Sequence, residues 1–364
     1  MLINIRHCRF KWLLLAAFVL FIGWLISATN GHNFSLNSRE GNIVTKLIQE
    51  SETRYFGFYS IKFPVDFSPK GMVMRVHGSD MTIVDTKLQY YYGFKQFLSR
   101  YEEELRNTTV SDLNDLPYLK DIYCLEPPTI GAIFERVENK NTPDFARTLD
   151  AWKWEDDITF SVKMLAQDGR AARYDEIRKI AKYSYRYDVP EKKRQLLAIL
   201  SSLQSRKDNH PPSEHKFAIQ FAQVDVSLLG EYEISVNYEN NKDISLAMQT
   251  DNGRYTDRIL LESDICSIGA TSCLTLYKGK RNINGLEVSE WLINQKTLAT
   301  TYPTLEYIFE LAIHEDKKEG HSPLKLSMYY KVDLLKPDGM LSEAELVSLW
   351  QHITRTIKYY PPDA

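Results

Sequence analysis

The sequence begins with a basic flank followed by an apolar run. No charged residue lies between Trp12 and about Ala28, and the residues before this run include Arg6, Arg9 and Lys11. This layout is typical of a signal peptide or a membrane anchor whose positive end stays on the cytoplasmic side. The pattern therefore predicts that residues 1–30 direct the rest of the chain across a membrane.

The apolar run is short for a membrane span. Seventeen helical residues cover roughly 25 Å, whereas the hydrocarbon core is about 30 Å thick. Residues 12–28 therefore either remain as a short anchor or are removed after the small-residue sequence Ile26-Ser27-Ala28. Their basic flank argues against a third interpretation, a buried core helix. The Asn-, Ser- and Gly-rich residues 31–42 are predicted to be a tether.

Residues 43–205 mix strand and helix patterns and are predicted to form an N-terminal domain. Extended patterns cover residues 58–63, 72–76, 81–85 and 158–164. A helix is expected where Phe94, Phe97, Leu98, Tyr101 and Leu105 fall on one face. Residues 107–145 are rich in turn residues, and Pro190 is placed to open a second helix.

A polar, proline-interrupted segment, 205–214, separates this domain from a C-terminal domain predicted at residues 213–364. Half-buried strand patterns follow at 217–226, 232–238, 244–248, 273–278, 306–313 and 324–332. Their short connections favour an antiparallel meander. Ser342 and Glu345 form a capping box for a final helix with Leu346, Leu349 and Trp350 in its apolar stripe. The predicted fold class is α+β, with two domains that each combine a mostly antiparallel sheet and packed helices.

Charge and composition point away from nucleic acid. The net charge is −3, the pI is near 6.3, and the basic residues are dispersed among acids. The 22 tyrosines fit β-rich structure and interaction surfaces. Two tyrosine clusters, Tyr90-Tyr91-Tyr92 and Tyr183/Tyr185/Tyr187, have two interpretations: anchors for a protein partner or alternation within a strand.

Three cysteines follow the apolar run. Cys266 and Cys273 flank a short Gly-containing loop, a spacing that can close a hairpin disulfide in an oxidising compartment. Two reduced, half-buried thiols are the alternative. Cys124 has no partner in either case and is expected to be a small core residue.

No catalytic, cofactor or metal motif was found. The sequence lacks Gly-x-Ser-x-Gly, Walker, His-Glu-x-x-His and Cys-x-x-Cys motifs. Residues 338–345 imitate half of an EF-hand loop, but Leu334 and Lys336 occupy its first ligand positions. His314 and His321 flank a charged loop that could hold a metal, although such a loop is usually solvated. We therefore assign no catalytic, cofactor or metal residue and expect a binding protein.

Three motifs together resemble a known family. They are Phe56-Gly57-Phe58-Tyr59-Ser60-Ile61-Lys62-Phe63-Pro64, Gly285-Leu286-Glu287-Val288-Ser289-Glu290-Trp291, and the final helix from Leu341 to Trp350, which continues to Ile357 and Pro361-Pro362. Their order resembles the class-four Tle cognate immunity proteins of bacterial type VI secretion. The sequence departs from the family pattern at Phe58, where the family usually has Gly-Arg before the aromatic residue, and at Val288-Ser289.

The resemblance implies a periplasmic protein that binds a phospholipase effector and inhibits it. Its two domains would clasp the lipase and block substrate access, in a one-to-one complex with a monomeric inhibitor. Two further hypotheses stay open. One is an envelope hydrolase with dispersed catalytic residues, for which His215, His314 or His321 beside a carboxylate would be the first sign. The other is a membrane-tethered ectodomain.

Overall fold

One large sheet runs through the whole molecule. The computed structural model describes residues 34–77, 82–181, 185–253, 259–297, 303–315, 322–335 and 339–360. Twelve strands form this sheet, in the order β14-β15-β16-β17-β13-β12-β3-β4-β8-β7-β6-β5. Every pairing within it is antiparallel. The predicted α+β class with mostly antiparallel strands is therefore confirmed.

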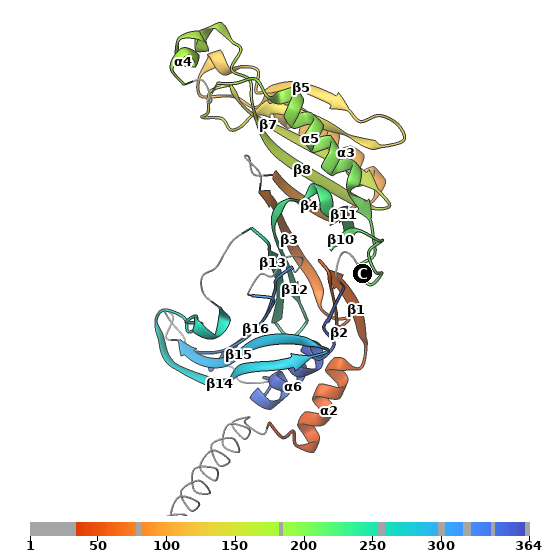
Figure 1. Ribbon diagram of the computed structural model, residues 1–364, viewed down its shortest axis with the longest axis vertical. Coiled ribbons are helices and arrows are strands. Elements are labelled where there is room, and N and C mark those ends of the chain that lie inside the picture. The colour runs from red at the N-terminus through yellow and green to blue at the C-terminus, as the bar shows by residue number, and fades with distance from the viewer. Residues whose placement is uncertain are drawn as a thin grey trace, which may run out of the picture.

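The sheet passes through an upper and a lower lobe (Figure 1). Its strands are β3 (Ser68–His77), β4 (Thr82–Leu88), β5 (Leu119–Cys124), β6 (Ile130–Val137), β7 (Ala146–Glu155), β8 (Ile158–Gln167), β12 (Glu231–Glu239), β13 (Ile244–Asp251), β14 (Ala270–Ile283), β15 (Leu286–Thr297), β16 (Thr304–Ile313) and β17 (Leu324–Asp333). Two small sheets have three strands each. One contains β1 (Ser51–Phe56), β2 (Tyr59–Pro64) and β18 (Lys358–Tyr359). The other contains β9 (Gln204–Ser205), β10 (Lys216–Ile219) and β11 (Ala222–Asp225). The helices are α2 (Ser38–Ile48), α3 (Tyr91–Asn107), α4 (Asp175–Ile180), α5 (Val189–Ser202) and α6 (Glu343–Thr354).

Period-two alternation gives the sheet one buried face. In β12, Tyr232, Ile234, Val236 and Tyr238 are buried, while the residues between them are partly or fully exposed. The same alternation runs through β13 and β17. The buried residues join those of α5 and α6 in one continuous core that extends through both lobes. Each fully buried apolar side chain of this kind stabilises the fold by about 1.5–3 kcal/mol.

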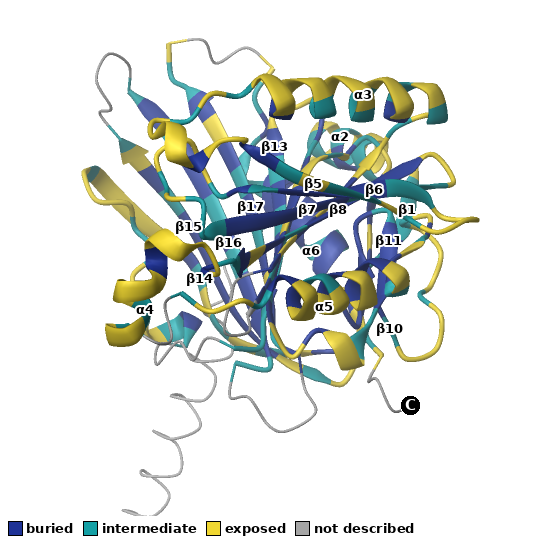
Figure 2. Ribbon diagram, turned by 90° about the horizontal axis from the view of Figure 1, so that it is seen from above, coloured by how far each residue is buried: buried dark blue, intermediate teal, exposed yellow. Residues whose placement is uncertain are grey.

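Two helices cover opposite faces of the upper lobe (Figure 2). On one face, Phe97 and Tyr101 of α3 pack edge-on against Trp152 of β7. On the other, Lys153 Nζ donates to the carbonyl of Leu203, just after α5, at 2.7 Å. Strand residues alternate between faces, so neighbours on β7 contact different helices.

The two ends of the described chain meet in the lower lobe. Strand β18 pairs with β2, and α2 packs beside α6. The Oγ of Ser342, the N-cap of α6, donates to Oε1 of Glu40 in α2 at 2.8 Å. The capping box predicted at Ser342 and Glu345 is present.

The prediction of a tether at residues 31–42 is wrong for residues 38–42, which belong to helix α2. A helix begins at Ser38 because the Asn37 side chain accepts from the backbone N–H groups of Arg39 and Glu40, both at 3.0 Å, while Glu40 reaches back to Asn37. Asn37, which the prediction assigned to the tether, is the N-cap of this helix.

The lobes do not follow the predicted domains 43–205 and 213–364. Strands β1, β2 and β3 come from the first half of the sequence but lie in the lower lobe (Figure 1). Strand β3 pairs with β12 from the second half, with Met74 opposite Ile234. The turn-rich segment 107–145 also contains strands β5 and β6, which its prolines concealed.

The segment between the two halves is fixed by one arginine. Arg206 is buried, and its guanidinium donates to the carbonyls of Tyr55, Lys207, Asp208, His210, Ile219 and Ala222 at 2.6–3.4 Å. Burial lowers the pKa of Arg206, although nearby Asp208 opposes this shift. The residues expected to form a boundary therefore pack tightly against β1, β10 and β11.

Candidate partner-binding surface

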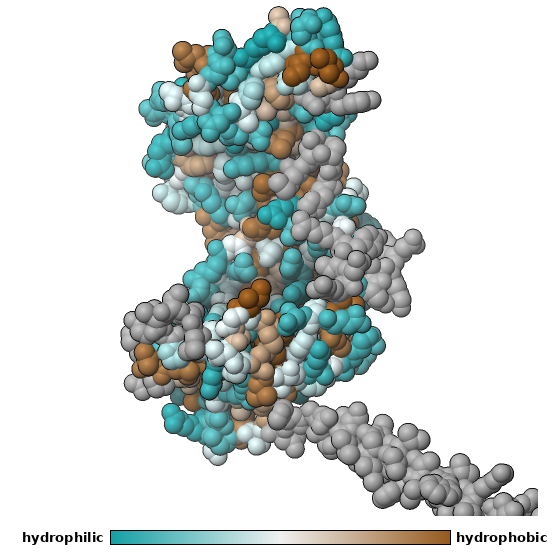
Figure 3. Space-filling model, turned by 90° about the vertical axis from the view of Figure 1, so that its left-hand side faces the viewer, coloured by the Kyte–Doolittle hydropathy of each residue, from teal (hydrophilic) through white to brown (hydrophobic). Residues whose placement is uncertain are grey.

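None of the described helices covers one strip of the large sheet. It consists of the outward residues of β4, β3, β12, β13 and β17, which we call the open face. Register places them side by side: Ile83 opposite Arg75, Arg75 opposite Glu233, Ser235 opposite Gln249, and Gln249 opposite Lys325. The molecule narrows between its two lobes, and Figure 3 shows this waist from the side.

The open face mixes ion pairs with exposed apolar side chains. Arg75 lies 3.0 Å from Glu233, and Lys325 lies 3.1 Å from Glu310 of β16. Val73 and Ile83 are 47% and 37% exposed on neighbouring strands. Mixed polar and apolar surface of this kind is typical of non-obligate protein interfaces.

Helix α3 borders the open face on the upper-lobe side. Beneath it lies Asp150, which is completely buried and accepts a hydrogen bond from Tyr101. Arg136 and Lys163 lie 3.7 and 3.9 Å from its carboxylate. Burial raises the pKa of Asp150, and these cations only partly oppose it. These contacts attach α3 to the sheet of the upper lobe beside the open face.

The segment around Leu260–Glu262 borders the open face on the lower-lobe side. Leu260 packs with Trp291, Ile293 and Ala312 in a small apolar cluster, against which Ile265, Cys266 and Ile308 also pack. The sulfur atoms of Cys266 and Cys273 form a disulfide in the structure. Cys124 is exposed in β5, so its expected place in the core is wrong.

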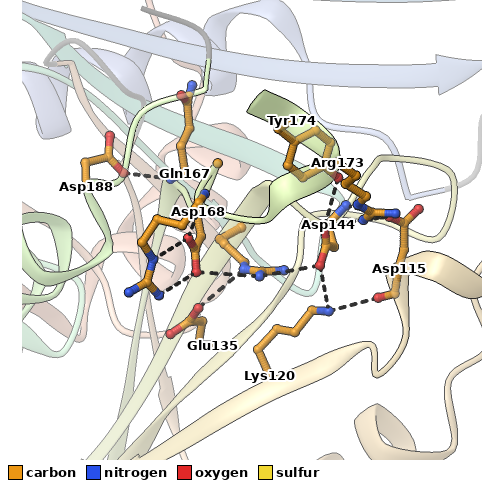
Figure 4. Close-up of polar contacts among 12 residues, drawn as sticks. Asp115, Lys120, Glu135, Asp144, Gln167, Asp168, Arg173, Tyr174 and Asp188 are labelled. Carbon is orange, nitrogen blue, oxygen red and sulfur yellow. Dashed lines mark hydrogen bonds and ion pairs between the residues drawn. The ribbon is translucent and has the colours of Figure 1, made fainter. Parts of the chain in front are cut away.

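A dense ion-pair network lies at the far end of the upper lobe (Figure 4). Asp144 accepts from Arg173, from Tyr174 Oη at 2.8 Å and from Lys120 Nζ at 3.1 Å. Burial raises the pKa of Asp144, but these donors outweigh it and the net shift is downward. Arg147 bridges to Glu135 and Asp168 at 3.4 and 3.8 Å. Because opposite charges are matched, this network is structural and offers no unpaired charge to a ligand.

The tyrosine clusters have different surroundings from those expected. Tyr90, Tyr91 and Tyr92 lie at the start of helix α3, so strand alternation does not explain them, and Tyr90 and Tyr92 are 65% and 72% exposed. Tyr185 packs against Phe145 and Tyr174, and Tyr187 lies under the Arg170 guanidinium. Tyr183 lies outside the described residues. Tyr90 and Tyr92 are therefore the most exposed described tyrosines of the two clusters, ahead of Tyr187 at 44%.

Among the described residues, His314 and His215 have different surroundings. His314 Nδ1 lies 2.8 Å from Tyr59 Oη, and His321 is outside the described residues. His215, Glu214 and Ser213 line a cavity of about 220 Å³ beside Tyr360. However, the His215–Glu214 pair is solvent-exposed at 3.5 Å, and Ser213 Oγ accepts from Gln223 at 3.0 Å. The hydroxyl group of Ser213 therefore bonds to Gln223 and not to the imidazole of His215.

The described residues contain neither a metal-ligand cluster nor a membrane-spanning helix. No group of three or more His, Cys, Asp or Glu side chains among them could hold a metal ion. Within the same ranges, no helix is long and apolar enough to cross a membrane. The predicted segment 12–28 lies outside the described residues.

The motifs that carried the family resemblance meet in the lower-lobe core. Glu290 is 1% exposed and accepts from Trp350 Nε1 at 2.6 Å and from Arg281. Burial raises the pKa of Glu290, and these donors oppose it. Gly285 forms the β14–β15 turn at a φ of +87°. These contacts fix the final helix to the sheet.

The sequence patterns located the buried face of the sheet but missed the open face. Val73 and Ile83 are apolar residues at outward positions of alternating strands, where polar residues are the rule. This departure from alternation is the sequence signal that could have identified the open face. It could not be used without knowing that β3 and β4 are neighbours.

Comparisons with known proteins agree on one family. The model for the Tle cognate immunity protein 4 N-terminal domain matches residues 52–206, and the model for the C-terminal domain matches residues 211–362. No curated protein matches the chain. The apo structure of the immunity protein TplEi of the type VI secretion system from Pseudomonas aeruginosa has a TM-score of 0.58 at 16% identity, covering 85% of this chain and 97% of that one.

Two further solved structures share the fold. A crystal structure of a Tle4–Tli4 complex has a TM-score of 0.56 at 15% identity and covers 86% of this chain and 99% of that one. TplEi complexed with an "L" peptide has a TM-score of 0.53 at 16% identity, with the same coverage.

Proposed function

This chain belongs to the Tle cognate immunity protein 4 family, and we propose that it binds a Tle-type phospholipase effector of type VI secretion and inhibits it. The family membership confirms the resemblance in the sequence motifs. Its relative in the Tle4–Tli4 complex is named with its effector, which supports the same kind of partner here.

The observation that carries the proposal is the open face, which lies between helix α3 and the segment around Leu260–Glu262. A clasp that contacts one partner with both lobes engages two patches at high effective concentration. Val73 and Ile83 supply exposed apolar contact, while Arg75 and Glu233 supply charge beside them. Bound there, the protein would block entry of phospholipid to the lipase.

We further propose that inhibition takes place in the periplasm. The basic flank and apolar segment at residues 12–28 support export, and the Cys266–Cys273 disulfide fits an oxidising compartment. Cell fractionation of the producing bacterium should recover the protein with periplasmic or inner-membrane markers. Recovery from the cytosol alone would contradict this location.

The decisive experiment mixes residues 31–364 with the lipase effector encoded by the neighbouring gene. At an equimolar ratio, phospholipid hydrolysis should stop and a one-to-one complex should elute from gel filtration. Val73→Asp combined with Ile83→Asp should weaken inhibition by tenfold or more, on the order of 1.4 kcal/mol or greater.

Val65→Asp is the matched control, because Val65 is 45% exposed but lies outside the open face. It should leave inhibition unchanged. Full lipase turnover with wild-type protein and no complex would contradict the proposed function. Equal inhibition by the open-face variant would contradict the proposed surface alone.

The alternative of an envelope hydrolase is not favoured by the geometry. Its best sign, His215 beside Glu214, lacks a hydrogen bond to Ser213 in the structure, and both side chains are largely exposed. Charges in that setting are screened by water and interact weakly.

A further inference from the structure

The two long helices of the upper lobe are attached to their sheet unequally (Figure 2). Two of the 17 residues of α3 are buried, Phe94 and Leu105. Five of the 14 residues of α5 are buried, and the apolar ones among them belong to the continuous core: Val189, Leu196, Ile199 and Leu200. Leu105 belongs instead to a small separate cluster with residues of β5 and β6. Elements with few buried apolar contacts open locally at the lowest free-energy cost, so α3 is the more easily released helix.

The start and the apolar stripe of α3 also hold it weakly. Phe97, Leu98 and Tyr101 are only partly buried. The N-cap residue, Tyr90, makes no capping hydrogen bond with its side chain, and the first turn carries no acid. Capping side chains and first-turn acids normally stabilise this end of a helix. The attachment of α3 therefore depends on aromatic contacts and on the hydrogen bond from Tyr101 to Asp150.

The surface beneath α3 contains polar atoms that the docked helix leaves unpaired. Asp150 Oδ1, Trp152 Nε1 and Arg136 Nε are buried and have no hydrogen-bond partner among the described residues. Burying an unpaired donor or acceptor is unfavourable. Release of α3 would open these atoms to water or to a partner, and this gain offsets part of the cost of release.

This covered surface is continuous with the open face. Lys163 of β8 lies opposite Asp150 of β7 on one side and opposite Ile83 of β4 on the other. The three side chains therefore share one face of the sheet, and Trp152, two residues after Asp150, lies on the same face. Tryptophan and arginine are enriched at binding hot spots. Beneath α3, the open face thus continues with residue types that are favoured in protein interfaces.

We propose that α3 is a releasable cover, and that its release extends the open face over β8 and β7 for binding of the lipase effector. This inference rests on the proposed function and adds a concealed part to its contact surface. A two-fold contact between copies of this chain would require both copies to release α3, whereas the effector requires one release only. In the complex, the Trp152 and Arg136 donors would meet acceptors of the effector.

Hydrogen exchange of the free protein, residues 31–364, tests the release directly. After correction for intrinsic rates, amides of α3 should exchange about 100-fold or more faster than amides of α5. Local release exposes little surface, so low concentrations of urea should scarcely change exchange in α3 but should steeply accelerate it in α5. Equal rates that rise together with urea would show that α3 leaves the sheet only on global unfolding, and would overturn the proposal.

Two variants make the comparison sharper. Ile199→Val weakens the continuous core, so it should accelerate exchange in α5 by roughly two- to tenfold and leave α3 unchanged. Tyr101→Phe removes a contact that is lost in both local release and global unfolding, so it should accelerate both helices equally. Tyr92→Phe, at a 72% exposed position of α3, is the matched control and should change neither helix. Acceleration of α3 by Ile199→Val would contradict a separate release.

The lipase encoded by the neighbouring gene, added at an equimolar ratio, tests the partner. When the complex forms, exchange in α3 should become faster still, because the effector occupies the surface that α3 leaves. Unchanged or slower exchange in α3 would show that the helix stays docked and would overturn the proposal. Exchange in the free protein that varies with its concentration would assign the covered surface to a second copy and overturn it as well. If no complex forms, the proposed function fails and the effector with it, while the free-protein rates still decide whether α3 is released.

Discussion

The pKa values of single carboxylates in this protein are shifted in opposite directions. Asp144 is surrounded by donors that lower its pKa, whereas burial raises the pKa of Asp150 and of Glu290. Exposed ion pairs contribute little to stability, so the buried and half-buried carboxylates are the ones whose removal should be measurable.

Asp144→Asn should lower the free energy of unfolding by about 1–2 kcal/mol at pH 7, because Arg173 and Lys120 would each lose a charged partner and keep only their contacts with Asp115. The folded-state pKa of Asp144 lies below its unfolded value. Its contribution is therefore present above the unfolded pKa and is lost as pH falls through the folded pKa.

Urea titrations of wild type and Asp144→Asn between pH 3 and pH 7 would measure this effect. The stability difference should shrink below about pH 4. Glu176→Gln, at an 86% exposed position, is the control and should change stability little at any pH. A difference that is independent of pH would show that the carboxylate charge is not responsible.

At the scale of elements, short connections are fixed by covalent or dense polar contacts. The disulfide closes the turn before β14, and Arg206 fixes the segment before β10.

Non-reducing denaturation of residues 31–364 should expose one reactive thiol, Cys124, because Cys266 and Cys273 are bonded. Reduction should raise the count to three. Replacing both bonded cysteines by serine should lower the free energy of unfolding by about 2–3 kcal/mol, as expected for a short closed loop. Three thiols before reduction would rule out the disulfide.

Arg206→Met should lower the free energy of unfolding by roughly 3–5 kcal/mol, since six carbonyl contacts would lose their donor. Urea denaturation followed by circular dichroism measures the change. Arg194→Met, at a 77% exposed position, should change stability by less than about 0.5 kcal/mol. Similar losses in both variants would mean that the position of Arg206 is not special.

Element type was predictable from sequence where alternation or helical spacing was strong. The strands at 232–238 and 324–332 and the capped final helix are confirmed. β5 and β6 were missed because Pro117, Pro127 and Pro128 surround them, and local composition cannot show that a distant strand will complete the pairing. The open face was beyond prediction for the same reason, since it depends on β3 lying beside β12.

At the scale of the whole molecule, the shared core joins the two lobes. Buried side chains of β4 and β8 belong to the same cluster as those of β12 and β17. Thr86 Oγ1 on β4 also donates to the Gln220 carbonyl at 2.6 Å, next to the small β9–β10–β11 sheet.

The two lobes should therefore unfold in one transition. Single-tryptophan variants that retain either Trp152 in the upper lobe or Trp350 in the lower lobe would report each lobe separately. Their urea midpoints should coincide with each other and with circular dichroism. Two separated midpoints would show that the lobes are thermodynamically independent.

The pairing of β18 with β2 also sets the order of events during synthesis. Tyr59 cannot meet Tyr359 until almost the entire chain has been made. Strand β3 likewise cannot complete its pairing in the central sheet until β12 has been synthesised. The lower lobe therefore remains unfolded while the chain emerges from the ribosome. An emerging polypeptide in that state is narrow enough to pass through a membrane channel, which suits the export proposed above.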